Sequence, residues 1–149
     1  MATPPQTIKV RKARLGDARV IAGLSGQLGY PASEKETTQR LSRLLRLRLN
    51  LILIAETDSR ELIGWLHVSV VALLEMPLKA EVNGLVVDEA ARSAGAGAKL
   101  LAAAEHWAKS KRCVTMNVRS NVIRERAHGF YQRNGYEHYK TQKAFRKVL

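Results

Sequence analysis

A run of six small residues constrains this chain more than any other feature of its sequence. Residues 93–98 are all serine, alanine or glycine, and they lie between the apolar run 85–87 and a helical pattern that contains Leu100 and Leu101. This order predicts a strand, a loop and a helix, and side chains this small let a ligand approach the backbone closely. Because the first turn of a helix leaves N–H groups unpaired at the positive end of its dipole, the segment is typical of an anion site.

The small-residue loop also has a purely structural explanation, because alanine and glycine let a helix pack close to a sheet. The segment is not a Walker A loop, since it lacks Gly-Lys followed by Ser or Thr, and it is not a G-x-G-x-x-G Rossmann turn. Arg92 adds a guanidinium just before the small residues, which suits phosphate oxygens. The loop alone therefore indicates an anion site without identifying the anion.

Hydrophobic periodicity predicts the remaining elements. We expect strands at 8–11, 51–56, 61–74, 80–87, 114–118 and from 136 onward. We expect helices after Asp17, after a capping box formed by Ser33 and Glu36, from about 95 to 110, and from Ser120 or Asn121 to about 133, where Gly135 fits a left-handed cap. Hairpins mixed with β-α-β units predict an α/β fold with a mixed sheet and helices on both faces, in one domain over 1–149 with a loose tail at 1–6.

Composition limits the classes of protein that this chain can be. Its 149 residues make about one domain, and 46% hydrophobic with 26% charged residues is an ordinary globular mixture. One cysteine and four scattered histidines predict neither an internal disulfide nor a metal site. The longest apolar run, 63–74, is too short to span a bilayer, and the N-terminus has no apolar signal core. We therefore expect a cytoplasmic protein with no membrane partner.

The formal charge of +12 is unevenly distributed, because residues 111–149 hold ten basic and two acidic side chains. Such a field attracts polyanions, which include nucleic acid, acidic protein and a phosphorylated cofactor. A basic nucleic-acid-binding module is therefore one alternative for the function. Two features argue against nucleic acid as a partner. The aromatic content is only 5%, and the sequence has no recognisable recognition helix.

Two groups of residues make the chain resemble the GCN5-related N-acetyltransferase (GNAT) superfamily. Arg92-x-x-Gly95-x-Gly97 is similar to the family motif R/Q-x-x-G-x-G/A, which cradles the pyrophosphate of coenzyme A. The second family signature, N…A…F-Y…G-F/Y, is matched by Asn121, Ala127, Phe130-Tyr131 and Gly135-Tyr136. The resemblance covers about residues 8–149. It implies a GNAT-like acyl-CoA N-acyltransferase fold, in which the central sheet is mostly antiparallel and two strands splay apart.

The resemblance also implies an activity. The enzyme would transfer the acetyl group of acetyl-CoA to a primary amine by direct attack in a ternary complex, with no metal. The acceptor would be a small molecule or a protein amine, and the sequence does not choose between them. A non-catalytic acyl-CoA sensor of the same fold is a second alternative. Dimerisation is common among relatives, so a homodimer stays open.

By resemblance, the backbone of one strand and one loop binds the cofactor. Val86 and Val87 would bond to the pantetheine arm, while Asn121, Arg124 and Tyr131 would flank its other side. The amides that would hold the pyrophosphate belong to Arg92, Ser93, Ala94, Gly95, Ala96, Gly97 and Ala98. Arg40, Arg43, Arg46 and Arg48 form a separate basic run, which either selects an acidic acceptor or solvates a helix.

Tyr131 corresponds to the residue that often serves as general acid in this family. A phenol has a reference pKa of about 10, so at neutral pH it can donate a proton to the departing thiolate. The alternative is that Tyr131 is an ordinary packing aromatic, as we expect for Phe130. The resemblance therefore implies a catalytic role for Tyr131.

The general base is less well defined. Relatives often use a glutamate on the strand that holds Glu81, and the two-residue spacing places Glu81 and Asn83 on one face. Some relatives carry glutamate where Asn83 stands, so this chain departs from their pattern. Glu81 is either the base or a salt-bridged surface carboxylate, and His67 and His128 are further candidates.

Overall fold

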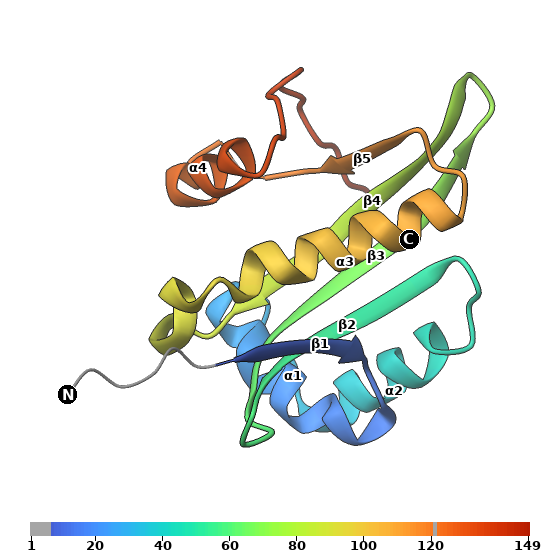
Figure 1. Cartoon of the computed structure of the whole chain (residues 1–149). Coiled ribbons are helices and arrows are strands. Elements are labelled where there is room, and N and C mark those ends of the chain that lie inside the picture. The colour runs from blue at the N-terminus through green and yellow to red at the C-terminus, as the bar shows by residue number, and fades with distance from the viewer. Residues whose placement is uncertain (1–6, 121) are drawn as a thin grey trace. The chain divides into compact units, whose positions relative to one another are not determined.

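The computed structural model of the chain describes residues 7–120 and 122–149, apart from the side chain of Ser93 (Figure 1). It divides into two compact units, one that ends at Val118 and one that comprises Arg119–Leu149. A single domain over 1–149 stays a prediction. The elements in chain order are β1 (Ile8–Lys12), η1 (Leu15–Asp17), α1 (Ala18–Gln27), α2 (Glu34–Leu44), β2 (Asn50–Thr57), β3 (Leu62–Leu73), β4 (Met76–Val87), η2 (Glu89–Ala94), α3 (Ala96–Ser110), β5 (Thr115–Val118) and α4 (Glu125–Arg133).

The five strands of the first unit form one sheet in the order β1-β2-β3-β4-β5. The first four strands are antiparallel neighbours, and β5 runs parallel to β4. The α/β fold with a mixed, mostly antiparallel sheet is therefore confirmed. β5 pairs with β4 only from Lys79 to Val82, whereas β4 continues to Val87. Residues 83–87 thus have no strand partner on that side within the described part of the chain, which is the splay that the resemblance implies.

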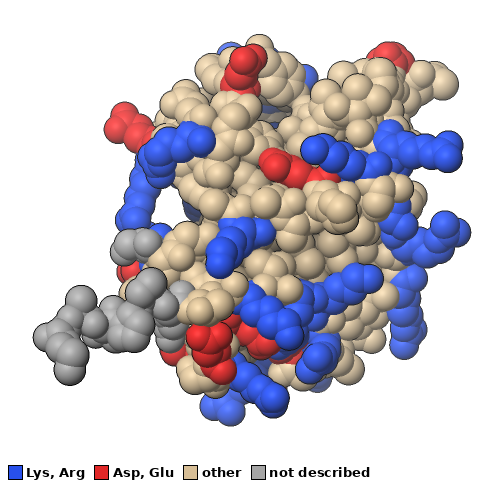
Figure 2. Space-filling view, in the orientation of Figure 1, with Lys and Arg blue, Asp and Glu red and all other residues tan. Residues whose placement is uncertain are grey.

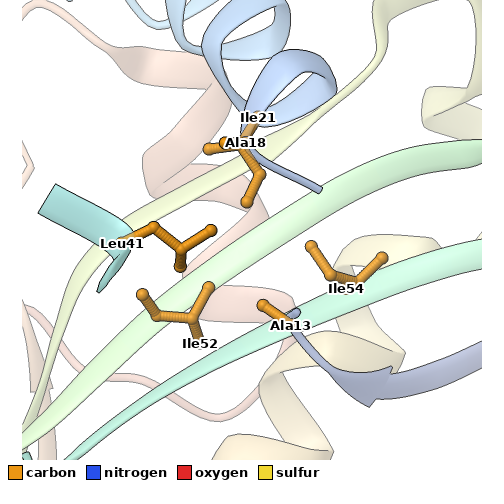
Figure 3. Packing of buried hydrophobic residues seen from close by; sticks show 6 residues of the cluster. All are labelled: Ala13, Ala18, Ile21, Leu41, Ile52 and Ile54. Carbon is orange, nitrogen blue, oxygen red and sulfur yellow. The ribbon is translucent and has the colours of Figure 1, made fainter. Parts of the chain in front are cut away.

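Helices cover both faces of this sheet, as predicted. Figure 1 shows α3 across one face, and α3 packs on β1 to β4 with Leu100, Leu101, Ala104 and Ala108 buried. Helices α1 and α2 pack on the other face. Their buried residues join residues of the sheet and of the β1–α1 connection in the cluster shown in Figure 3, which comprises Ala13, Ala18, Ile21, Leu41, Ile52 and Ile54.

Two predicted helix starts have different local chemistry. The capping box before α2 is confirmed, because Ser33 Oγ accepts from the Glu36 amide at 3.0 Å and Glu36 Oε1 accepts from the Ser33 amide at 3.3 Å. Asp17 stands at the N-cap of α1, but its side chain does not cap that helix. Its carboxylate instead accepts two bonds of 2.9 Å from the Arg11 guanidinium, which also bonds to Glu56 at 3.0 Å. A cation on β1, six residues earlier in the chain, therefore pairs with the carboxylate that the sequence pattern predicts as a helix cap.

Replacing Asp17 with Asn is expected to lower the free energy of unfolding at pH 7 by about 1–3 kcal/mol, because it leaves the half-buried Arg11 without its bidentate partner. The Arg11 hydrogen bonds hold the pKa of the Asp17 carboxyl below its ordinary value of 3.8. The stabilisation is therefore present above that value and is lost as the pH falls through the lower pKa of the folded state. Urea unfolding from pH 7 to pH 3 measures both effects.

The matched control is Asp58→Asn on the exposed β2–β3 turn, which removes the same charge without breaking a buried ion pair. We expect its unfolding curve to follow that of the parent protein across the pH range. Equal losses of stability in the two variants at pH 7 would show that net charge, rather than the Arg11 pair, is responsible.

In the second unit, the end of α4 is confirmed and its start is not. The helix begins at Glu125 with Arg124 as N-cap, rather than at Ser120 or Asn121, and Asn121 lies outside the described residues. At the other end, Gly135 has a φ of +89°. Its amide donates to Gln132 at 3.1 Å, and the following amide donates to the carbonyl of Tyr131 at 3.0 Å, which completes a Schellman cap.

The predicted strand from 136 onward is wrong, since residues 136–149 form no strand in the structure. A sequence pattern indicates which residues would share a face of a strand. A strand also needs a neighbouring strand to pair with, and the pattern does not indicate whether one is there. Phe145 and Val148 in this segment are 91% and 87% exposed. No helix among the described residues has the length and apolar character needed to cross a membrane.

Candidate functional site

The connection from β4 to α3 forms an amide-lined turn at a helix N-terminus. Asp88 starts it by accepting a bond of 3.2 Å from the Ala90 amide, and Gly95, with a φ of +82°, ends η2 and starts α3. A left-handed φ is strained for residues with a side chain, so this turn requires glycine. The first helical bond runs from the Lys99 amide to the Gly95 carbonyl at 3.2 Å. The amides of residues 96–98 precede it and have no helical carbonyl to bond to.

The predicted pyrophosphate residues fall into two groups, one on each side of Gly95. Ala96, Gly97 and Ala98 present the amides of the first helical turn, at the positive end of a helix of 15 residues. Arg92, Ser93 and Ala94 lie instead in η2. Ala94, Gly95 and Ala98 are exposed, and their small side chains leave the backbone open to a ligand.

Arg92 lies against the end of β4. Its Nε donates to the carbonyl of Val87 at 3.4 Å, and its guanidinium is 3.7 Å from Glu89. The Glu89 side chain is 67% exposed, and an ion pair this exposed contributes little free energy. Arg92 can therefore exchange Glu89 for an anion at small cost.

Gln27, at the end of α1, braces this turn, and no sequence pattern indicates this role. Its Nε2 donates to Asp88 Oδ1 at 3.5 Å, and its Oε1 accepts from the Glu89 amide at 3.1 Å. These contacts join residues about 60 positions apart. Sequence patterns around Gln27 do not predict these contacts, because only the tertiary fold brings α1 to the loop.

Val86 and Val87 lie in the part of β4 that β5 does not cover. Val86 is opposite Trp65 and Val87 is opposite Gly64, so β3 fixes one edge of both residues. The register skips Asn83, which is an extra residue between the pairs made by Val82 and Gly84. Such a bulge bends a strand and increases its twist, which is consistent with the separation of β4 from β5.

Glu81 lies just before this bulge, with Ser69 opposite it on β3 and Asn117 opposite it on β5. It is 8% exposed, which contradicts the alternative of a surface carboxylate. Asn83 Nδ2 donates to Ser69 Oγ at 2.8 Å, so Asn83, Ser69 and Glu81 share one face of the sheet, as the spacing indicates. A buried carboxylate therefore lies where the two strands separate.

His67 lies on the same face, one position along β3 from the bulge, opposite Gly84. Its Nε2 is 2.8 Å from Asn50 Oδ1, and an amide oxygen only accepts, so Nε2 carries the proton. Burial lowers the pKa of this imidazole below 6.5, so the ring is neutral at pH 7. His128, the other histidine candidate, lies on α4 in the second unit.

Tyr131 is the seventh residue of α4, in the second unit. Its ring makes edge contacts with Phe130 and Tyr136 at centroid distances of 5.2 and 5.9 Å. Burial raises the pKa of the Tyr131 phenol above 10, and the nearby charge of Arg124 opposes this change. The phenol is therefore protonated at neutral pH and can donate a proton.

The structure brings the predicted residues of 86–98 together in the first unit, while Arg124, the N-cap of α4, and Tyr131, within α4, lie in the second. Within residues 7–120 and 122–149, no three His, Cys, Asp or Glu side chains are grouped in a way that could hold a metal ion.

Comparison with known proteins identifies the family. Residues 21–136 match the acetyltransferase (GNAT) family. A Bacillus subtilis protein named uncharacterized N-acetyltransferase YhfO is 31% identical over 135 residues, which cover 87% of this chain and 90% of the relative. The chain therefore belongs to the GNAT acetyltransferase family.

Solved structures confirm the fold. An aminoglycoside antibiotic 6'-N-acetyltransferase, AAC(6')-Ih from Acinetobacter baumannii, has a TM-score of 0.85 at 20% identity, with 96% of this chain and 99% of that chain covered. The aminoglycoside N-acetyltransferase AAC(6')-Iy in complex with CoA has a TM-score of 0.87 at 18% identity, with both chains fully covered. The arrangement of strands and helices is thus that of a GNAT acetyltransferase.

Proposed function

We propose that this protein transfers the acetyl group of acetyl-CoA to a primary amine, by direct attack while both substrates are bound. The observation that carries the proposal is the turn at residues 95–98, which is exposed at Gly95 and Ala98 and which η2 connects to the uncovered edge of β4. The name of the Bacillus subtilis relative and the CoA complex of a structural neighbour support it.

The residues present fit acetyl-CoA. The amides of Ala96, Gly97 and Ala98 would hold the diphosphate, and Arg92 would add a positive charge beside it. The free edge at Val86 and Val87 would bond to the amides of the pantetheine arm as a neighbouring strand does. When bound, acetyl-CoA supplies a thioester that is activated toward amines.

The protein would supply two proton-transfer groups. Glu81 would accept the proton that the amine loses, directly or through water, because a carboxylate of low exposure is a competent base in a site closed to bulk solvent. Tyr131 would donate its phenolic proton to the departing sulfur. We propose both roles by resemblance, supported by the burial of Glu81 and the protonated state of Tyr131.

Glu81→Gln is expected to lower kcat/KM by about 100-fold and to remove the acidic limb of its pH profile, because the amide cannot accept a proton. The measurement is log(kcat/KM) from pH 5 to pH 9. Glu75→Gln on the exposed β3–β4 hairpin is the control, and we expect it to keep the profile of the parent. An acidic limb that persists in Glu81→Gln would exclude Glu81 as the base and leave His67 to be tested in the same way.

A thiol-release assay against a panel of amines, combined with calorimetric titration of acetyl-CoA, tests the function as a whole. We expect binding together with amine-dependent release of CoA. Binding of acetyl-CoA with no release for any amine would favour a sensor. Binding of oligonucleotides without acetyl-CoA would overturn the proposal in favour of a nucleic-acid module.

A further inference from the structure

Four basic side chains in the first unit line a cavity that the proposed reaction does not use. The cavity has a volume of about 270 Å³ and lies beside Ala13, just after β1, and beside Asn50, at the start of β2. No Asp or Glu is among the described residues that line it. Its basic lining residues are Lys12, Arg46, Arg48 and Lys111.

These four cations come from three separate parts of the chain. Lys12 is the last residue of β1, Arg46 and Arg48 belong to the connection between α2 and β2, and Lys111 follows α3. None of the four forms an ion pair with another residue in the described part of the chain. Like charges repel when a fold gathers them, so a bound anion would stabilise this arrangement. The dipole of α3 accounts for Lys111 at the helix end, but it does not account for the other three cations.

The residues that line the cavity also include one aromatic and several aliphatic side chains. Trp107 is the aromatic one, and Lys111 Nζ lies over its ring, 5.9 Å from the centroid. Leu44, Leu51 and Ile52 supply aliphatic surface. An indole and aliphatic side chains pack well against a flat ring, whereas guanidinium groups bind phosphate oxygens in pairs. The lining therefore suits a molecule that has both a ring and a phosphate.

This cavity is separate from the proposed acetyl-CoA site. Trp107 is ten residues beyond Gly97 on α3, which corresponds to about 15 Å along the helix at 1.5 Å per residue. Across the sheet, the cavity lies at β1 and β2, whereas the uncovered edge belongs to β4. Figure 2 shows Lys and Arg side chains along the right of this face, where Figure 1 shows the end of α3 and the connection that follows α2.

The geometry points to a binding site for a nucleoside phosphate in this cavity, with Arg46 and Arg48 on the phosphate and Trp107 against the base. Its volume lies just below the usual range for small-molecule pockets, so it suits one nucleotide rather than a nucleic-acid strand. The site does not depend on acetyl transfer, so it can be tested whether or not the proposed function holds.

Calorimetric titration of AMP into the full chain tests the site, without CoA in the cell because CoA carries the same adenine and phosphates. We expect the double variant Arg46→Ala/Arg48→Ala to bind AMP at least tenfold more weakly than the parent. The matched control, Arg40→Ala/Arg43→Ala on α2, removes the same charge from exposed positions outside the cavity lining and should change binding less than twofold. Because Arg46 and Arg48 are exposed, their loss should not unfold the protein. Lys111→Ala provides a second, independent variant.

Several results would overturn this inference. One is that the parent does not bind AMP. Another is that AMP affinity falls equally in both double variants, and a third is that Arg92→Ala, rather than Arg46→Ala/Arg48→Ala, abolishes AMP binding.

Tryptophan fluorescence tests the role of Trp107, since AMP should quench the fluorescence of the parent but not that of Trp107→Phe. Inorganic phosphate should bind at least tenfold more weakly than AMP, and equal affinity would remove the role of the ring. Tighter binding of a twelve-nucleotide single strand than of AMP would assign the surface to nucleic acid.

Discussion

Tyr131→Phe is expected to lower kcat by about 100-fold or more and to leave the affinity for acetyl-CoA within a factor of two. The substitution removes the proton donor for the departing thiolate and retains the ring. Because phenylalanine can keep the edge contacts with Phe130 and Tyr136, the packing of α4 should be preserved. Steady-state kinetics with saturating amine, together with calorimetric titration of acetyl-CoA, separates the two effects.

The control for this variant is Tyr139→Phe, which removes a phenol that is 63% exposed in the same unit. We expect it to have the kcat of the parent. If Tyr131→Phe turned over at the parental rate, Tyr131 would be a packing aromatic and the acid would have to be found elsewhere. Thermal unfolding of both variants shows whether any loss of activity comes from loss of structure.

Ala98→Asp is expected to weaken CoA binding by at least 30-fold without lowering the melting temperature. A carboxylate in the first turn of α3 interacts favourably with the helix dipole, so it should stabilise the helix by about 0.3–1 kcal/mol. The same carboxylate would stand where we propose that the diphosphate binds, and would repel it. Stability and binding should therefore change in opposite directions, which general damage to the fold cannot produce.

Two further variants show whether charge at this position is the cause. Ala98→Asn has nearly the same shape as the Asp variant without its charge, and should recover most of the affinity. Ala102→Asp places the same charge on an exposed position one turn further along α3, and should have a smaller effect. Equal losses in Ala98→Asn and Ala98→Asp would mean that side-chain size, and not repulsion, is responsible.

Local chemistry explains which parts of the fold were predictable from the sequence. The capping box at Ser33 and Glu36 and the left-handed Gly135 depend on neighbours within a few residues, so the sequence contains their whole signal. The helix from Ala96 to Ser110 is strongly periodic and was predicted within one residue. The sequence alone predicts a start of α4 three or four residues too early, because Ser120 and Asn121 are good caps in isolation.

Tertiary contacts explain what could not be predicted. Asp17 resembles a helix cap, but its carboxylate pairs with Arg11 on β1, which also bonds to Glu56 on β2. The brace from Gln27 to the loop at Asp88 depends on a packing that no local pattern records. The burial of Glu81 follows from its position between β3 and β5, whereas its sequence neighbours allowed an exposed position equally well.

The proposed function depends on backbone amides at the start of α3 that hold the diphosphate of acetyl-CoA. Titration of ¹⁵N-labelled protein with CoA, followed by amide chemical shifts, observes those donors directly. We expect the largest downfield proton shifts at Ala96, Gly97 and Ala98, with smaller changes at residues 86–87. Saturable CoA binding that leaves these three amide signals unmoved would show that the diphosphate binds elsewhere.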